Sequence, residues 1–126
     1  MKVKFTETIK SEVEIDFQKI FDFIKSDLEK VPVYNNFVSK EQIYNAFRTN
    51  SFYYLVKTEQ INKDIDVNDN KAMLNSIVDK FFIFCMKCEK VSYYVLKSGE
   101  VLANYDDKEM ASMYAHRMDG YIIEVK

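Results

Sequence analysis

The stretch covering residues 70–88, NKAMLNSIVDKFFIFCMKC, is the longest strongly periodic run in the sequence. Its apolar residues recur at the i, i+3, i+4 and i+7 spacing, which predicts a helix with one buried face. That face is formed by Leu74, Ile77, Val78, Phe81, Cys85 and Cys88. A helix of this kind needs a surface to cover, and we expect the apolar segments before and after it to supply that surface.

The N-terminal segment alternates between apolar and polar residues. The apolar side chains occupy odd positions, at Val3, Phe5, Ile9, Val13 and Ile15. This period of two predicts a strand with one face in water, formed either as one long strand or as a tight pair that turns within residues 7–10. Because the turn region has no Gly or Asn-Gly, we expect the long strand. A long edge strand can pair with a second copy, so we also expect a homodimer or a larger assembly.

Two helices are predicted next, followed by an ambiguous segment. Asp16 is placed to cap a helix over residues 17–30, which Pro32 ends. An S-x-x-Q capping box at residues 39–42 begins a second helix. The following SFYYLVK fits a strand or a helix. Its aromatic and branched residues favour a strand over residues 52–56.

The C-terminal part predicts a strand, a turn, a strand, a helix and a strand. Residues 91–97 and 100–105 are expected to form a hairpin around a Ser-Gly turn. A short helix follows, capped by Asp106 or Asp107 and closed by Gly120 at the C′ position. Its expected core face consists of Ala111, Tyr114, Ala115 and Met118.

These elements predict an α+β fold with one mostly antiparallel sheet, helices packed on a face of it, and a C-terminal strand-strand-helix-strand unit. The 126 residues fit a single domain, residues 1–126, that is large enough to bury a core without disulfides or metal.

Charge and residue usage argue against several classes of protein. There are 18 basic and 20 acidic residues, with a net charge of -2 and no long run of one sign, which argues against a nucleic-acid-binding face. No stretch has the apolar length of a membrane span or of a secretory signal, so we expect a cytoplasmic protein with reduced thiols. Two glycines are too few for a glycine-rich phosphate cradle.

A C-x-x-C pair, Cys85 and Cys88, ends the long periodic run. A zinc site needs about four ligands, and His116 is the only other Cys or His side chain in the sequence. A redox pair prefers a helix N-terminus, whereas this pair lies at the C-terminal end. We therefore expect both cysteines to pack in the core. A small nucleic-acid-binding or regulatory module that uses the pair to bind a metal remains the alternative.

A second pattern, Asp64-x-Asp66-x-Asn68, matches the first ligands of a calcium-binding loop. The position that requires glycine is Asp69, and the position that requires a bidentate glutamate is Asn75. We therefore expect a solvated loop whose side chains cap the next helix.

The two arginines of this lysine-rich sequence, Arg48 and Arg117, are the groups best suited to a bidentate grip on phosphate or carboxylate. His116 has no nucleophile near it in sequence, so no catalytic site is indicated and we expect no enzyme activity. Aromatic residues are in surplus, and exposed Tyr beside an arginine forms an interface or a stacking platform. The expected binding residues are Arg117, Arg48, Tyr94, Tyr105 and His116.

The segment covering residues 94–125, in particular GEVLANYDDKEMASMYA followed by DGYIIEV, resembles a hairpin-helix-strand segment of small proteins encoded by phages and mobile elements. The resemblance implies a non-catalytic inhibitor of a host defence, similar to anti-CRISPR proteins or to Thoeris anti-defence proteins that sequester cyclic ADP-ribose-like signals. Such a protein acts in the host cytoplasm without a cofactor. It binds a defence effector protein or a nucleotide-derived signal stoichiometrically.

Overall fold

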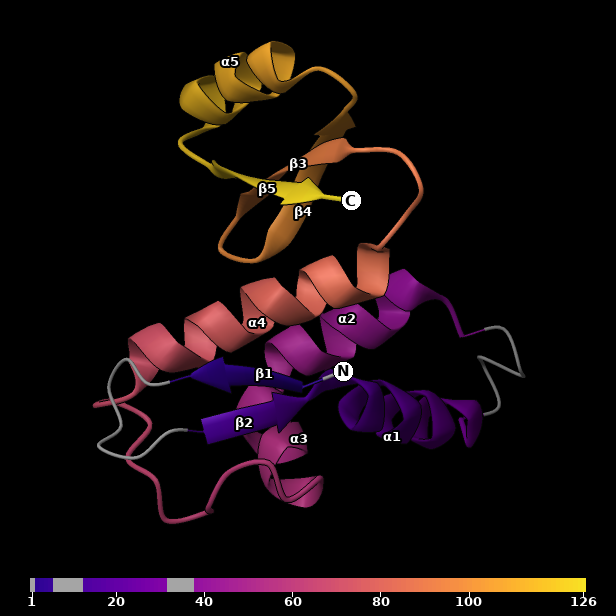
Figure 1. Ribbon diagram of the computed structural model, residues 1–126, viewed down its shortest axis with the longest axis vertical. Coiled ribbons are helices and arrows are strands. Elements are labelled where there is room, and N and C mark those ends of the chain that lie inside the picture. Colours follow the sequence, from indigo (N-terminus) through magenta and orange to yellow (C-terminus); the bar gives the residue numbers. More distant parts are fainter. Residues whose placement is uncertain (1, 6–12, 32–37) are drawn as a thin grey trace. The chain divides into compact units, whose positions relative to one another are not determined.

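The fold was analysed in a computed structural model that describes residues 2–5, 13–31 and 38–126 (Figure 1). The predicted α+β class is confirmed, and the chain divides into two compact units, Met1–Phe81 and Phe82–Lys126. Within the described residues the strands form two sheets, where one sheet was expected. The first unit holds a two-stranded sheet and the second a three-stranded sheet.

The N-terminal segment forms a pair of strands, so the prediction of one long strand is wrong. β1 (Lys2–Phe5) and β2 (Val13–Asp16) pair antiparallel, with Lys2 opposite Asp16. The pairing lets each strand satisfy backbone groups of the other, which one long edge strand does not achieve. Residues 6–12, where the alternative placed a turn, lie outside the described residues.

Both predicted helix starts are confirmed. The Asp16 side chain accepts a hydrogen bond of 3.2 Å from the backbone N–H of Lys19 and caps α1 (Phe17–Glu29). α2 (Lys40–Thr49) begins with the expected capping box. The Ser39 hydroxyl accepts a hydrogen bond from the Gln42 N–H at 3.2 Å, and the Gln42 side chain accepts one from the Ser39 N–H at 2.8 Å. Pro32, expected to end the first helix, lies outside the described residues.

The ambiguous segment is a helix, α3 (Ser51–Lys57), so the strand expected over residues 52–56 is wrong. Tyr54 and Leu55 are consecutive and both buried. A strand sends consecutive side chains to opposite faces, whereas a helix places both on one flank together with Thr58. Thr58 is also buried, and its hydroxyl donates to the Tyr54 carbonyl at 2.7 Å. Packing has therefore outweighed strand propensity here.

The long periodic run is confirmed as a helix, α4 (Lys71–Met86). Its Phe81 ring lies 5.9 Å from the Phe17 ring of α1 and 4.5 Å from the Phe47 ring of α2, all measured between centroids. The three side chains are buried, so they join three helices at the core of the unit Met1–Phe81. Aromatic pairs of this kind add to the stabilisation that area burial alone provides.

The buried surface of α4 is wider than the single stripe expected from the sequence. The pairs Met73-Leu74, Phe81-Phe82 and Cys85-Met86 are all buried. The helix ends at Met86, two residues before Cys88. Cys85 is buried as expected, but Cys88 is exposed, so the prediction that Cys88 continues the buried face is wrong.

The unit Phe82–Lys126 contains a three-stranded antiparallel sheet in the order β4-β3-β5. Its strands are β3 (Ser92–Lys97), β4 (Glu100–Tyr105) and β5 (Tyr121–Val125). The predicted hairpin turn is confirmed, since Ser98 and Gly99 have φ of 52° and 79°. Positive φ at both central residues is the signature of a type I′ turn, whose twist matches that of the two strands.

α5 (Lys108–Met118) connects β4 to β5 and covers one face of the sheet (Figure 1). Of the two caps considered, Asp107 caps the helix, accepting a hydrogen bond of 2.8 Å from the Glu109 N–H. Ala111 and Ala115 are buried against Val95 of β3, as their small size allows. Leu102, Ala103, Tyr105, Tyr114 and Ile122 are among the partly buried residues packed around them.

Gly120 follows the C-cap Asp119 and so closes α5 at the C′ position, as predicted. The left-handed conformation is adopted by Asp119, with φ of 57°. The Gly120 N–H then donates to the Ala115 carbonyl at 2.8 Å. A Cβ on Gly120 would lie 2.6 Å from the carbonyl oxygen of Leu96 in β3. Glycine is needed here because two backbones approach closely, and not because of its φ.

Candidate functional site

The residues expected to bind a partner lie in both units. Arg48 is in the last turn of α2, in the unit Met1–Phe81, where it is half-buried and its Nε atom is buried. Tyr94, Tyr105, His116 and Arg117 lie in the unit Phe82–Lys126. We therefore treat these four as the candidate group and do not combine Arg48 with them.

The sheet separates the two expected tyrosines. Tyr105 lies opposite Tyr93 on the face that α5 covers, and its ring centroid is 6.0 Å from that of Tyr114 in α5. Tyr94 follows Tyr93 along β3, so its side chain points to the other face. There its ring meets that of Phe82, with centroids 5.0 Å apart at an interplanar angle of 82°. Tyr94 therefore does not lie beside α5, the helix that carries Arg117.

α5 turns an unusual set of side chains outward. Met110 and Met113 are 55% and 67% exposed, and Arg117 is exposed as well. The spacing of these three residues, i, i+3 and i+7, places them on one side of the helix. Tyr114, half-buried, lies one turn before Arg117 on the flank of that side. We call these four residues, Met110, Met113, Tyr114 and Arg117, the α5 outer face.

The methionines of this face were not among the binding residues expected from the sequence. A signal for them was present, because the core side of the helix is taken by the small residues Ala111 and Ala115. The larger apolar side chains at 110 and 113 are offset from that side by the helical period, so they had to face outward. Met118, expected in the core, is 36% exposed.

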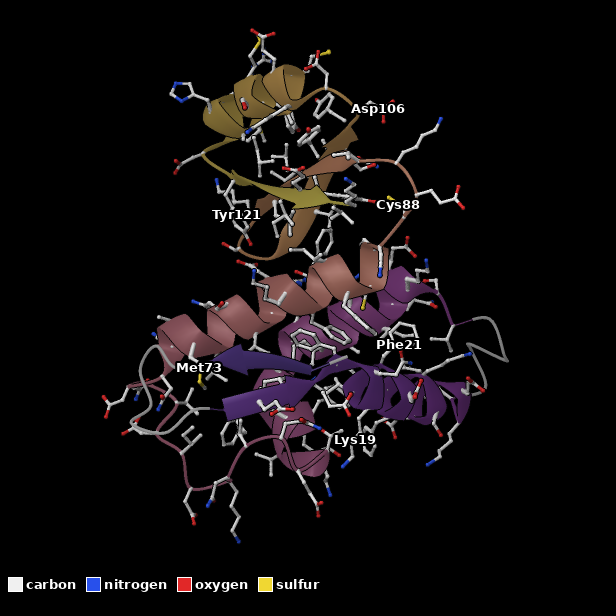
Figure 2. All side chains as sticks on the ribbon, viewed as in Figure 1. Lys19, Phe21, Met73, Cys88, Asp106 and Tyr121 are labelled. Carbon is white, nitrogen blue, oxygen red and sulfur yellow. The ribbon has the colours of Figure 1, made fainter. Side chains whose placement is uncertain are left out.

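Charge is distributed unevenly along α5. Asp106, Asp107 and Glu109 lie at its start, beside the one basic residue Lys108, and His116 and Arg117 lie in its last turn, before the C-cap Asp119. This arrangement complements the helix dipole. Figure 2 labels Asp106 in the turn that leads into α5 and Tyr121 at the start of β5, beyond the other end of the helix. Asp106, Glu109, His116 and Arg117 are all exposed.

The cysteine pair has no further ligand beside it in the described part of the chain. The exposed Cys88 thiol donates to the carbonyl oxygen of Lys90 at 2.8 Å, and Cys85 is buried in α4. Among residues 2–5, 13–31 and 38–126, no three His, Cys, Asp or Glu side chains are grouped so that they could hold a metal ion.

The loop with the calcium-like pattern uses its polar side chains locally. One carboxylate oxygen of Asp66 accepts hydrogen bonds from the N–H groups of Asn68 and Asp69, at 2.9 and 3.2 Å. The Asn70 side chain donates to the Asp66 carbonyl at 2.7 Å, next to the start of α4. The exposed Asp64, Asp66 and Asp69 agree with the expected solvated loop.

A second aromatic group lies on α3. The Tyr53 and Tyr54 ring centroids are 5.2 Å apart, and Lys57 Nζ lies 5.8 Å from the Tyr53 ring centroid. Burial raises the pKa of the Tyr54 phenol, and the nearby Asp27 and Tyr53 act in the same direction. Because Lys57 already lies over the ring of the half-exposed Tyr53, this group offers less apolar surface than the α5 outer face.

Comparison of the chain with protein-family models, with curated proteins and with solved structures gave no match. In the described part of the chain, none of the helices combines the length and the apolar character needed to cross a membrane.

Proposed function

We propose that this is a non-catalytic protein of the phage anti-defence type that neutralises a host defence effector protein by stoichiometric binding. In this proposal the α5 outer face carries the contact with the effector, in the host cytoplasm. Arg117 and the methionines supply the contact, with Tyr105 supporting Tyr114 from the sheet. The protein needs neither a metal nor a cofactor for this activity.

The exposure of Met110 and Met113 beside Arg117 is the observation that supports the proposal most strongly. Methionine, tyrosine and arginine are enriched at protein interfaces, and tyrosine and arginine often carry much of the binding energy. Methionine adapts its shape to irregular surfaces. A helix with such a face can bind in an apolar groove of the partner, and we expect Arg117 to pair with a carboxylate at the rim of that groove.

The same residues favour a protein over a nucleotide-derived signal. A nucleobase needs a flat ring on which to stack. The Tyr105 ring packs against Tyr114, and Tyr94 lies on the other face of the sheet. On the outer face, the ring nearest Arg117 is that of Tyr114, which is half-buried against Tyr105. The two flexible methionines add exposed apolar area suited to an extended protein surface.

The test is phage plating on a panel of bacterial strains, each carrying one defence system and expressing this protein. We expect restored plating in the strain whose effector is the target. The Met110→Asp/Met113→Asp variant should lose this effect, because two carboxylates cannot enter an apolar groove without a desolvation cost. Lys25→Asp, which reverses an exposed charge on α1, is the matched control and should keep full activity.

Calorimetry with the purified effector then measures stoichiometry and affinity. We expect a fixed molar ratio, and Arg117→Ala should weaken binding by about 2 to 4 kcal/mol if the contact is buried. Inhibition by catalytic amounts of the protein would overturn the non-catalytic proposal. Full activity of both Met110→Asp/Met113→Asp and Arg117→Ala would rule out the α5 outer face as the binding surface. Binding of cyclic ADP-ribose instead of the effector would overturn the choice of a protein target.

A further inference from the structure

We propose that the α5 outer face also binds a second copy of this chain, in a symmetric dimer whose two α5 helices lie antiparallel. This inference goes beyond the proposed function, because it needs no effector. It also does not use the N-terminal strand that first suggested a dimer. It depends on the order of apolar and charged side chains along α5 and the turn that leads into it.

The order is self-complementary. Met110 and Met113 lie symmetrically about the midpoint between residues 111 and 112, within α5. Asp106, in the turn just before the N-cap Asp107, and Arg117, in the last turn, are equally many residues from that midpoint. In an antiparallel pair with a twofold axis at that midpoint, Met110 therefore faces Met113 of the second copy. The last turn of each helix, with Arg117, then lies at the acidic start of the other, where we expect it to pair with Asp106 in the turn before the N-cap, and each contact occurs twice.

The four residues are available for such a contact. Met110 and Met113 are more than half exposed, and Asp106 and Arg117 are exposed. The methionines form an apolar centre with opposite charges at the two ends, which is the usual arrangement of an interface. Glu109, also exposed, lies next to Asp106 and adds negative charge where Arg117 of the second copy would arrive.

Charge also selects the antiparallel orientation. In a parallel pair each acidic start of α5 would face the other acidic start, and Arg117 would face Arg117 of the second copy, which is repulsive. In the antiparallel pair the two helix dipoles also oppose each other favourably. An exposed ion pair contributes only about 0 to 1 kcal/mol. The two Arg117 to Asp106 pairs therefore set orientation and register, while the methionines supply most of the buried apolar area.

The interface is small, so the dimer should be weak. α5 has 11 residues. A helix of that length is only about 16 Å long. One such face covers less area than a standard stable interface, which points to a dissociation constant on the order of micromolar or weaker. A target that binds the same face would then compete with the second copy.

Sedimentation velocity on the purified chain, from about 5 to about 500 µM to span the expected affinity, is the test. We expect the 15.0 kDa species to give way to one of twice that mass as concentration rises. Arg117→Asp and Asp106→Arg should each be monomeric, because each places like charges opposite one another. An equimolar mixture of the two variants should dimerise, since both of its contacts pair Asp with Arg.

The double variant, Arg117→Asp with Asp106→Arg, should also dimerise, and Lys25→Asp should behave as the unmodified chain. Circular dichroism confirms that every variant is folded. A monomer at all concentrations overturns the inference, as does a dimer that the single reversals leave intact or a mixture that stays monomeric. Because the chain is measured alone, none of these results bears on whether an effector is bound.

Discussion

The core of the unit Met1–Phe81 joins residues that are far apart in sequence, whereas the sheet of the unit Phe82–Lys126 joins strands that are closer together in sequence. In the first, Phe17, Phe47 and Phe81 come from three helices and meet in one aromatic group. In the second, β3 pairs on one side with β4, which follows it after a two-residue turn. α5 then returns the chain to the other side of β3, where β5 pairs with it. Local sequence signals are therefore sufficient for much of the second unit, while the first depends on packing between distant segments.

The cores of the two units also differ in side-chain size, and this difference determines which side chains of α5 are exposed. Large aromatic rings fill the first core, whereas under α5 the helix contributes Ala111 and Ala115. The small alanines let α5 lie close to β3, and the larger Met110 and Met113 remain outside. The second unit therefore presents the apolar face from which both proposals are derived.

The largest expected effect tests the long-range core. Phe81→Ala should lower the free energy of unfolding by about 3 to 5 kcal/mol, because it leaves a cavity between two other rings. Urea denaturation followed by circular dichroism measures this loss. Phe84→Ala is the matched control, a half-buried phenylalanine on the same helix, and should cost less. Equal losses would contradict the central place of Phe81.

The next effect tests the helix that replaced an expected strand. Leu55→Ala and Tyr54→Ala should each destabilise by about 3 kcal/mol, since the two side chains are buried. Tyr53→Ala should cost less than about 1 kcal/mol, because that ring is half exposed. The same denaturation experiment applies. If Tyr54 or Leu55 were replaced without cost, the alternation of a strand would fit better than α3.

The sequence predicted those parts of the fold whose limits are set by local chemistry. The Asp16 cap, the Ser39 capping box and the Ser98-Gly99 turn each satisfy backbone groups within a few residues, and all three are confirmed. The strand expected over residues 52–56 was wrong because aromatic and branched side chains favour a strand by propensity, and packing outweighed that preference. Only contacts such as that between Phe23 and Tyr54, with centroids 6.1 Å apart, distinguish a helix from a strand here.

The candidate site was predicted only in part. Arg117 and Tyr105 were identified as residue types, and the structure places Tyr105 against Tyr114, one turn from Arg117. The separation of Tyr94 follows from strand alternation once the register of β3 is known. Met110 and Met113 were passed over because exposed methionine carries no chemical signature, and its importance depends on the alanines that fill the opposite side of the helix.

A smaller effect tests the close approach of α5 to β3. Gly120→Ala should destabilise by about 1 to 3 kcal/mol, because the new Cβ meets the Leu96 carbonyl oxygen and the backbone must shift. Gly120→Asn should be no better, since it carries the same Cβ. At Gly99 the constraint is the positive φ instead, so Gly99→Asn should cost less than Gly99→Ala. Thermal denaturation measures the melting temperature of each variant. If Gly120→Asn melted at a clearly higher temperature than Gly120→Ala, the backbone conformation of residue 120, and not its contact with Leu96, would be the reason that glycine is needed.

The smallest expected effect is a gain in stability at the end of the same helix. Asp119 adopts the left-handed conformation, which costs a residue with a Cβ about 1 kcal/mol more than it costs glycine. Its carboxylate also lies at the negative end of the α5 dipole, which is unfavourable. Asp119→Gly should therefore raise the free energy of unfolding by about 1 kcal/mol and the melting temperature by a few degrees. Asp119→Asn removes the charge alone and should gain less, while Asp119→Ala keeps the backbone strain and should gain least. A loss of stability in the glycine variant would mean that the Asp119 carboxylate makes a favourable contact that outweighs both costs, and a calorimetric melt of the three variants side by side separates these cases.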